Sequence, residues 1–214
     1  MGAGRTETTR AIFGIDAKES GQIFLDGREV AIHKPEDAIQ AGIVLAPEDR
    51  KKDGLCTKLS IRHNIALPNL DLLCNKMGVV SRSREDEMCR KVVDDLKVKT
   101  PNVDVNAGNL SGGNQQKLVV GKWLARNSRV VIFDEPTRGI DVNAKSEIYA
   151  LMKEFVENGG SIILVSSELP EIIGCSNRIM VMREGVVTGF LDQDEATEER
   201  VMQFASKGTN QEEK

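Results

Sequence analysis

Apolar residues along the chain fall either into short continuous runs or into helix-spaced patterns. Three apolar runs predict buried strands: Ile43–Ala46, Val130–Phe133 and Ile162–Ser166. Between the second and third, apolar positions at i, i+3, i+4 and i+7 predict a helix over about Val142–Glu157, which Gly159-Gly160 ends. Because apolar strands alternate with helices, the sequence predicts an α/β fold with a parallel sheet.

Two hairpins and several further helices complete the pattern. Asp26-Gly27 and Glu184-Gly185 each separate two strand-like runs and are strong two-residue turn signals. Shorter helices are predicted at Pro35–Ala41 and about Asp194–Ala205, and a charged loop at 47–54.

The region from about Ser60 to Val98 is helical and more polar, which predicts a helical sub-lobe. Residues 101–109 read as a linker. Residues 207–214 are polar and are expected to form a disordered tail, leaving one domain over 1–206.

Composition narrows the class of protein. The 214 residues suffice for one substantial domain, and 29 basic against 33 acidic residues argue against nucleic acid as the main partner. The four cysteines have no CxxC spacing, so we expect neither a zinc site nor a disulfide framework, and a reducing cytoplasm. No apolar stretch approaches ~20 residues and no signal peptide is visible, so we expect no membrane-spanning segment.

A Ser-Gly-Gly turn at Ser111–Gly113 opens onto an amphipathic stretch and therefore predicts a helix N-terminus. Free amides and the helix dipole make such a terminus an anion site, and glycines let the backbone approach a phosphate closely. Asn114 and Gln115 follow directly and are included in this predicted nucleotide-binding segment.

Adjacent carboxylates, Asp134 and Glu135, follow the second apolar run. Open α/β sheets carry their sites at the carboxyl ends of strands, so we expect Asp134 to hold Mg²⁺ and Glu135 to polarise an attacking water. The alternative is that both simply face solvent. Asp141 precedes the helix at Val142 and is expected to cap it.

The segment Gly2-Ala3-Gly4-Arg5-Thr6-Glu7 is similar to the second half of a P-loop, G-x-x-x-x-G-K-[ST]. In a P-loop the amides cradle phosphates and the hydroxyl, here that of Thr6, binds Mg²⁺. The first glycine and the preceding strand are missing from the sequence given, and Arg5 stands where lysine is expected, which is not a conservative exchange at a tight phosphate site. A simple terminal glycine turn is the alternative.

Five segments together resemble the C-terminal nucleotide-binding domain of bacterial monosaccharide ABC importers of the ribose, xylose, arabinose and galactose types. They are GAGRTE, PEDRKKDGL, LSGGNQQK, DEPTRGIDV and VSSELPEI, and the resemblance runs from Gly2 to about Ala205. It makes Leu110–Lys117 the signature motif and Val130–Asp141 the Walker B segment with its D-loop. The resemblance implies a P-loop NTPase core with a mixed or parallel sheet, an antiparallel β subdomain and a helical sub-lobe, truncated before the P-loop strand.

Two positions depart from the family pattern. Ser167 stands where the switch histidine is usual; serine can bond a phosphate but cannot titrate. Glu48 stands where a loop glutamine is usual, and a ligand role and a plain surface position are equally open. Asp141 matches the D-loop, which in the family crosses to the opposing domain.

The resemblance implies the second ATP-binding half of a sugar importer, with ATP and Mg²⁺ as cofactors. Its signature would complete an ATP site held by an N-terminal ABC domain or a second ATPase subunit, while its own site turns over slowly or not at all. The implied partners are a transmembrane sugar permease, against which the sub-lobe moves, and indirectly a periplasmic sugar-binding protein. The implied location is the cytoplasmic face of the bacterial inner membrane, as a peripheral protein.

Three other interpretations are weighed against this one. DNA-repair and chromosome-organising ATPases share LSGG-type signatures but would require coiled-coil heptads or zinc cysteines, which this chain does not show. Ribosome-associated ABC proteins do not fit the SSELPE and PEDRKKDGL segments. A non-catalytic regulatory or truncated ABC domain, without turnover of its own, is the main alternative.

Overall fold

The computed structural model describes residues 2–206; the predicted tail at 207–214 lies outside them. Its centre is a parallel sheet of β3 (Ile43–Ala46), β4 (Val130–Asp134) and β5 (Ser161–Val165), in the order β3-β4-β5. The registers Ile43↔Val130 and Val130↔Ser161 place the carboxyl ends of the strands at the same edge. All three predicted strands and the parallel sheet are confirmed.

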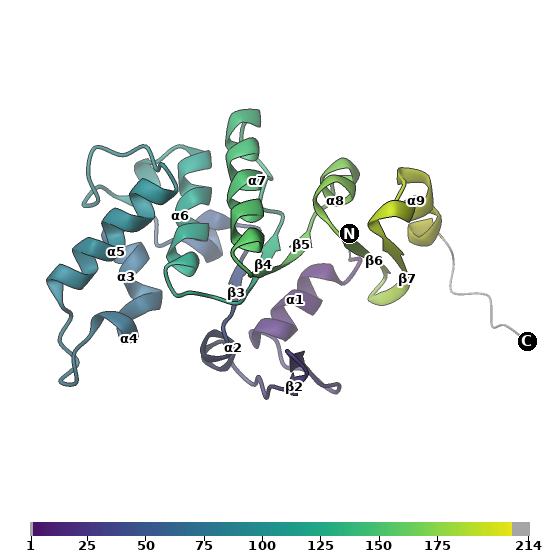
Figure 1. Ribbon diagram of the computed structural model, residues 1–214, viewed down its shortest axis with the longest axis horizontal. Coiled ribbons are helices and arrows are strands. Elements are labelled where there is room, and N and C mark those ends of the chain that lie inside the picture. The colour runs from purple at the N-terminus through teal and green to yellow at the C-terminus, as the bar shows by residue number, and fades with distance from the viewer. Residues whose placement is uncertain (1, 207–214) are drawn as a thin grey trace, which may run out of the picture.

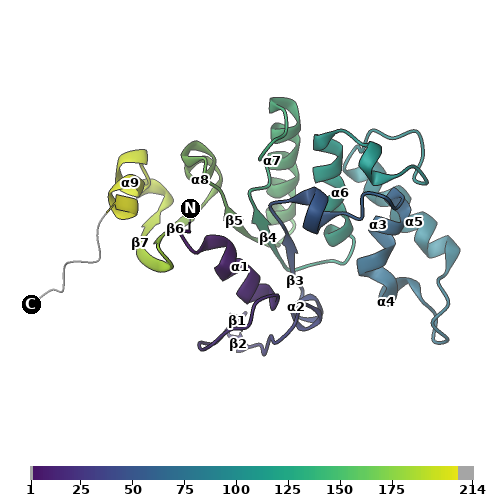
Figure 2. The same cartoon turned by 180° about the vertical axis from the view of Figure 1, so that it is seen from behind.

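Helices cover both faces of this sheet (Figures 1 and 2). On one side lie α6 (Gly112–Leu124) and α7 (Val142–Glu157); on the other lie α1 (Arg5–Phe13) and α2 (Pro35–Ala41). Because β4 is the middle strand between these layers, its residues from Val131 to Asp134 are all buried, as a continuous apolar run predicts.

Both predicted hairpins form. Asp26 and Gly27 have φ of 49° and 74°, the left-handed pair that a type I′ turn needs, between the two-residue strands β1 (Phe24–Leu25) and β2 (Arg28–Glu29). Glu184 and Gly185 make the equivalent turn between β6 (Arg178–Arg183) and β7 (Val186–Asp192).

The carboxyl-terminal part has a small core of its own. Residues Ile179, Val181 and Leu191 of the hairpin pack with apolar residues of α8 (Leu169–Cys175) and α9 (Glu198–Ser206). The last helix begins at Glu198 and not at about Asp194 as predicted, because a 3₁₀ turn at Gln193–Glu195 precedes it.

Among the described residues, β5 pairs only with β4 and β6 only with β7, so each has one unpaired edge. In both ribbon views the start of the chain lies between them (Figures 1 and 2). Arg5 donates to the Ser166 carbonyl at 2.6 Å, and Gly185 N–H donates to the Ala3 carbonyl at 3.1 Å, so residues 3–5 touch both sides of this gap.

The helical sub-lobe forms as predicted from α3 (Ile61–Ala66), α4 (Leu70–Leu73) and α5 (Arg82–Asp95). Part of the predicted charged loop at 47–54, which precedes the sub-lobe, has regular structure. Residues Arg50–Gly54 form one π-helical turn, because the Asp49 carboxylate accepts hydrogen bonds from the amides of Lys51 and Lys52.

The start of the sub-lobe is joined to the segment that precedes Ser111. Backbone hydrogen bonds connect Ile61 N to Val105 O, Arg62 N to Val103 O, and Ala107 N to Leu59 O, all between 2.9 and 3.0 Å. The predicted linker at 101–109 is thus held against 59–62, so the two ends of the sub-lobe are fixed together.

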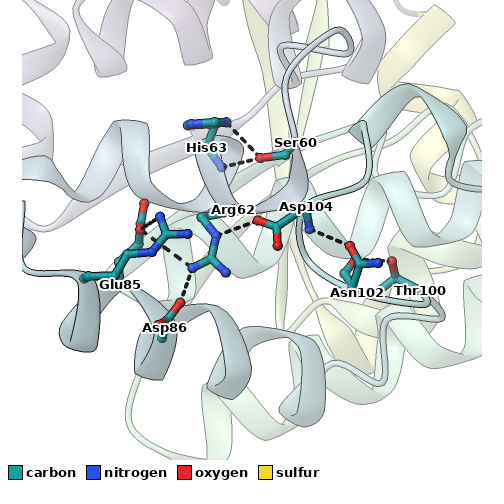
Figure 3. Close-up of polar contacts among 9 residues, drawn as sticks. Ser60, Arg62, His63, Glu85, Asp86, Thr100, Asn102 and Asp104 are labelled. Atoms are coloured by element: carbon teal, nitrogen blue, oxygen red, sulfur yellow. Dashed lines mark hydrogen bonds and ion pairs between the residues drawn. The ribbon is translucent and has the colours of Figure 1, made fainter.

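A buried arginine reinforces this junction (Figure 3). Arg62, whose side chain is 9% exposed, pairs with Asp104 of the linker at 2.8 Å and with Asp86 and Glu85 of α5. Asp104 and Asp86 raise the pKa of the guanidinium, against the opposing effect of its burial. One cation therefore ties α3, α5 and the linker together.

Within residues 2–206 we find no helix with the length and apolar character that crossing a membrane requires.

We expect Arg62→Met to destabilise the chain by about 1.5–3 kcal/mol, because it removes the charged hydrogen bonds that join α3 to Asp104 and Asp86, while Arg82 still pairs with the buried Glu85 at 2.8 Å. Urea unfolding followed by circular dichroism measures this. Arg90→Met is the matched control, since Arg90 is an exposed residue of α5, the helix of Glu85 and Asp86, with no ion pair within the described part of the chain. Equal stability of the two variants would contradict the role assigned to Arg62.

We expect a pH effect from Lys122, whose Nζ donates to the Gly54 carbonyl and lies 5.2 Å from the Trp123 ring centre. Burial lowers the pKa of Lys122 to about 8, whereas an unfolded lysine titrates near ~10.4. Between these values the unfolded chain binds more protons, so this group makes stability rise with pH. The difference in unfolding free energy between wild type and Lys122→Met should change from pH 8 to 10; a constant difference would contradict this.

Candidate functional site

The first site element is the N-terminal end of α1. Gly4 caps this helix with φ of 83°, and a Cβ there would meet Gly185 Cα at 2.7 Å, so the position requires glycine for both its backbone angle and its space. Gly2 also has positive φ, at 81°. Arg5 and Thr6 form the first turn of the helix, where free amides favour an anion.

Asp134 lies at the end of β4, opposite this helix end. It is 2% exposed, and burial raises the pKa of its carboxyl group. A hydrogen bond from Thr6 and the charge of Arg5 act in the other direction, while the charges of Glu135 and Glu7 raise the pKa further. The buried Oδ1 atom has no hydrogen-bond partner. A buried carboxylate oxygen left open beside a threonine hydroxyl fits a hard cation such as Mg²⁺.

Glu135 has an unusual backbone conformation. Its φ of 49° is left-handed, which is uncommon for a residue with a side chain, and its N–H donates to the Val165 carbonyl at 2.9 Å. Its Oε2 atom accepts a hydrogen bond from Ser167 Oγ at 3.1 Å. The chain bend after Asp134 thus directs Glu135 toward the segment that follows β5.

These positions form one group. The predicted residues Arg5, Thr6, Asp134, Glu135 and Ser167 meet at the carboxyl ends of β4 and β5, with Glu7 close enough to affect Asp134. Gly2 and Ala3 lead into it. A helix N-terminus, a cation-ready carboxylate and a second carboxylate in one place are the parts that phosphoryl transfer needs.

The Ser111 segment lies elsewhere. Ser111 is exposed and is the N-cap of α6, and both ribbon views place α6 on the far side of α7 from the start of α1 (Figures 1 and 2). Gly113 packs so closely on α7 that a Cβ would meet Ala144 Cβ at 2.6 Å. The two segments that are predicted to bind anions are therefore separated in the structure.

Asn114 and Gln115 hold the Ser111 loop in shape. Asn114 donates to Ser111 Oγ at 2.9 Å and accepts from the Lys99 amide at 2.9 Å. Gln115 is buried, and its side-chain amide donates to the carbonyls of Ala107 and Gly108 at 3.3 Å. Their side chains thus serve the loop itself, and a direct contact of either with nucleotide stays a prediction.

Glu48 forms an ion pair with Arg138, in the turn that follows Glu135. Next to it, the sequence analysis missed Arg50, whose guanidinium donates to the carbonyls of Arg138 and Gly139 at 3.2 and 3.3 Å. A Cβ on Gly112 would lie 3.0 Å from the same guanidinium. Arg50 thus joins the turn after Glu135 to the Ser111 segment, a role that a run of charged residues in a loop does not reveal.

Asp141 caps α7 by accepting a hydrogen bond from the Ala144 amide at 2.9 Å, which confirms that interpretation. Its contact with an opposing domain stays a prediction.

Comparison with known proteins agrees with this geometry. The family model described as ABC transporter matches residues 1–138. The chain is 49% identical to the putative ribose/galactose/methyl galactoside import ATP-binding protein 1 of Agrobacterium fabrum, over 96% of this chain and 41% of that protein. It is 50% identical to the ribose import ATP-binding protein RbsA of Oceanobacillus iheyensis, over 99% of this chain and 42% of that protein. The chain thus spans about two fifths of the length of these relatives.

Solved structures confirm the predicted fold class. A nucleotide-free ATP-binding cassette from an ABC transporter superposes with a TM-score of 0.77 at 18% identity, covering 96% of this chain and 81% of that one. The ADP conformation of another ABC transporter cassette gives 0.76 at 19% identity, covering 94% and 83%.

We expect Asp134→Asn to stabilise the chain near neutral pH while weakening Mg²⁺ binding. A carboxyl with a raised pKa makes the folded state less stable as pH rises from the unfolded value near ~3.9 through the folded one, and asparagine removes that penalty. Thermal melting with and without Mg²⁺ measures both effects. A lower melting temperature in metal-free buffer would contradict the account.

Proposed function

The chain belongs to the ABC transporter family, and from this premise we propose that it is the second ATP-binding half of a monosaccharide importer. The import proteins to which it is about half identical support the substrate class, since their names specify ribose or galactose. ATP binding and hydrolysis would then drive sugar uptake through a transmembrane permease at the cytoplasmic face of the inner membrane. A periplasmic sugar-binding protein would deliver the sugar.

One observation carries this proposal: the two segments that are predicted to bind anions lie apart in the same chain. Within residues 2–206, the exposed Ser111 at the start of α6 forms no hydrogen bond with Arg5, Thr6 or Asp134, and α7 stands between them. A single ATP could not use both. The Ser111–Gly113 amides therefore suit a nucleotide held by a second domain, either an N-terminal ABC domain or a second ATPase subunit.

The other site would bind the chain's own nucleotide. Mg²⁺, when bound, would neutralise phosphate charge, with Asp134 and the Thr6 hydroxyl as its protein ligands. Glu135 would orient water and accept its proton, while the Ser167 hydroxyl holds the Glu135 carboxylate at 3.1 Å. The amides of Gly4 to Glu7 would contact phosphate oxygens.

Slow turnover at this site is supported by Arg5. Its guanidinium is engaged by the Ser166 carbonyl at 2.6 Å, and a planar fork is a poor replacement for a compact lysine at a tight phosphate site. The same bond favours the second candidate function, a regulatory ABC domain that binds nucleotide without hydrolysis.

The sub-lobe would transmit closure to the permease. Its two ends are fixed together by the Arg62 contacts and the backbone bonds between 59–62 and 103–107, and the linker leads directly to Ser111. A domain that engages ATP through Ser111 would therefore move α3 to α5 as a unit. Glu48 and Asp141, near the turn after Glu135, would respond to the same closure.

We expect the chain alone to bind Mg-ATP and to hydrolyse it slowly, as measured by calorimetry and phosphate release. Mixed with an ABC domain that has a complete P-loop, it should accelerate hydrolysis by that domain. Gly112→Asp should abolish the acceleration, because a carboxylate at the helix start repels phosphate. Gly174→Asp adds the same charge at an exposed glycine with open space and is the control.

If the chain alone does not bind ATP, the proposed nucleotide site at Thr6 and Asp134 is wrong. If acceleration survives Gly112→Asp, the proposed role of Ser111–Gly113 in the partner's ATP site is wrong.

A further inference from the structure

Two hydrogen bonds of opposite direction join the turn after β4 to the segment after β5. Ser167 Oγ donates to Glu135 Oε2 at 3.1 Å, and Thr137 Oγ1 donates to Glu171 Oε1 at 2.9 Å. Each segment contributes one hydroxyl and one carboxylate. We call Ser167–Glu135 the outer contact and Thr137–Glu171 the inner contact.

The two contacts differ in their access to water. Thr137 and Glu171 are 2% and 5% exposed, whereas Ser167 is exposed and Glu135 half-buried. Water and ligands can compete for the outer contact, but the inner one is shielded, so its loss would leave a buried carboxylate short of donors. The buried Thr137–Glu171 contact is therefore the more stable of the two.

Glu171 has no cationic partner within residues 2–206, where no lysine or arginine forms an ion pair with it. Its neighbours are hydroxyl groups. The pKa of Tyr149 is raised to about 12, first by burial and then by the charge of Glu171 and a hydrogen bond with it, while a hydrogen bond with Thr137 acts in the other direction. Helix α7, the turn after β4 and α8 thus meet at this one carboxylate.

Glu135 and Thr137 belong to one turn, in which Glu135 has a left-handed backbone conformation that contacts with other residues must stabilise. Glu135 has φ of 49°, and its carbonyl accepts from the Arg138 amide at 3.2 Å, which closes the turn around Thr137. A left-handed residue with a side chain persists only where its surroundings over-determine it. Thr137, anchored on Glu171, supplies such a constraint from inside the turn.

We propose that Glu171 is a positioning residue that acts through Thr137 to hold the turn carrying Glu135, so that Ser167 can release Glu135 without the carboxylate losing its place. The inference rests on the proposed function, in which Glu135 orients water and Ser167 is free to contact phosphate.

The first test uses the only tyrosine in the chain. Ultraviolet titration should show the pKa of Tyr149 fall from about 12 in Glu171→Gln, because the neighbouring charge is gone, while burial still holds it above the free value near ~10. Thr137→Val, which removes the donor but keeps the shape, should leave it raised. An unchanged titration in Glu171→Gln would overturn the assignment of Glu171 as the charged centre.

The second test measures hydrogen exchange of the backbone amides of Glu135, Thr137 and Arg138. Both Glu171→Gln and Thr137→Val should speed exchange there by about tenfold relative to β3 and β4, and Thr137→Ser should restore the wild-type rate. Glu154→Gln, which neutralises an exposed carboxylate on α7, is the control. A uniform rise over the whole sheet, or no rise, would overturn the proposal, because either result makes Glu171 merely structural.

The third test separates positioning from binding in the same variants. Single-turnover hydrolysis should slow about tenfold while the Kd for Mg-ATP changes less than about twofold. Equal loss of both, or no loss of rate, would overturn the proposal. If the wild-type chain binds ATP without hydrolysis, the proposed activity fails, and the exchange and titration results still decide whether Glu171 holds the turn.

Discussion

The burial of Asp134 at the end of β4 is the constraint on which the rest of the site depends. A carboxylate that is 2% exposed can lie there only because Thr6 and Arg5 lie close to it and because β3 and β5 hold β4 from both sides. The same strand end fixes the left-handed bend at Glu135. The packing of three apolar strands therefore determines where Asp134 and Glu135 lie.

From this end of the sheet, connections run outward to the rest of the chain. Arg50 links the turn after Glu135 with the Ser111 segment, and Lys117 of α6 pairs with Glu147 of α7 at 2.8 Å. Lys145 of α7 pairs with Glu168 at 2.7 Å, next to Ser167. Helix α7 thus contacts the elements of both sites, which gives the two sites a common support.

The sequence predicted those features that depend on local order. Continuous apolar runs located the three core strands, Asp26-Gly27 and Glu184-Gly185 located both hairpins, and helical periodicity located α7 with the bounds that the structure has. The family resemblance implied a site that contains Arg5, Asp134 and Glu135, and the structure brings these residues together with Thr6 and Ser167, while their roles stay predictions.

The contacts that the sequence did not predict join residues far apart in the chain. Arg50, Arg62 and Glu171 are charged residues, which are usually exposed, and nothing next to them in the sequence indicates a distant partner. The π-helical turn at Arg50–Gly54 was missed because a single side chain, Asp49, stabilises it. Tertiary partners, rather than propensity, decide such positions.

The open edges of β5 and β6 have a practical consequence for handling the chain. Backbone groups alternate in direction along a strand, so every second residue of each edge directs its N–H and C=O away from its paired neighbour, and Ile163 and Met180 beside them are 39% and 46% exposed. Such an edge is a template for pairing with any extended polypeptide. Concentration, storage time and the choice of fusion partner therefore become experimental variables in their own right, because each controls how often two copies meet edge to edge.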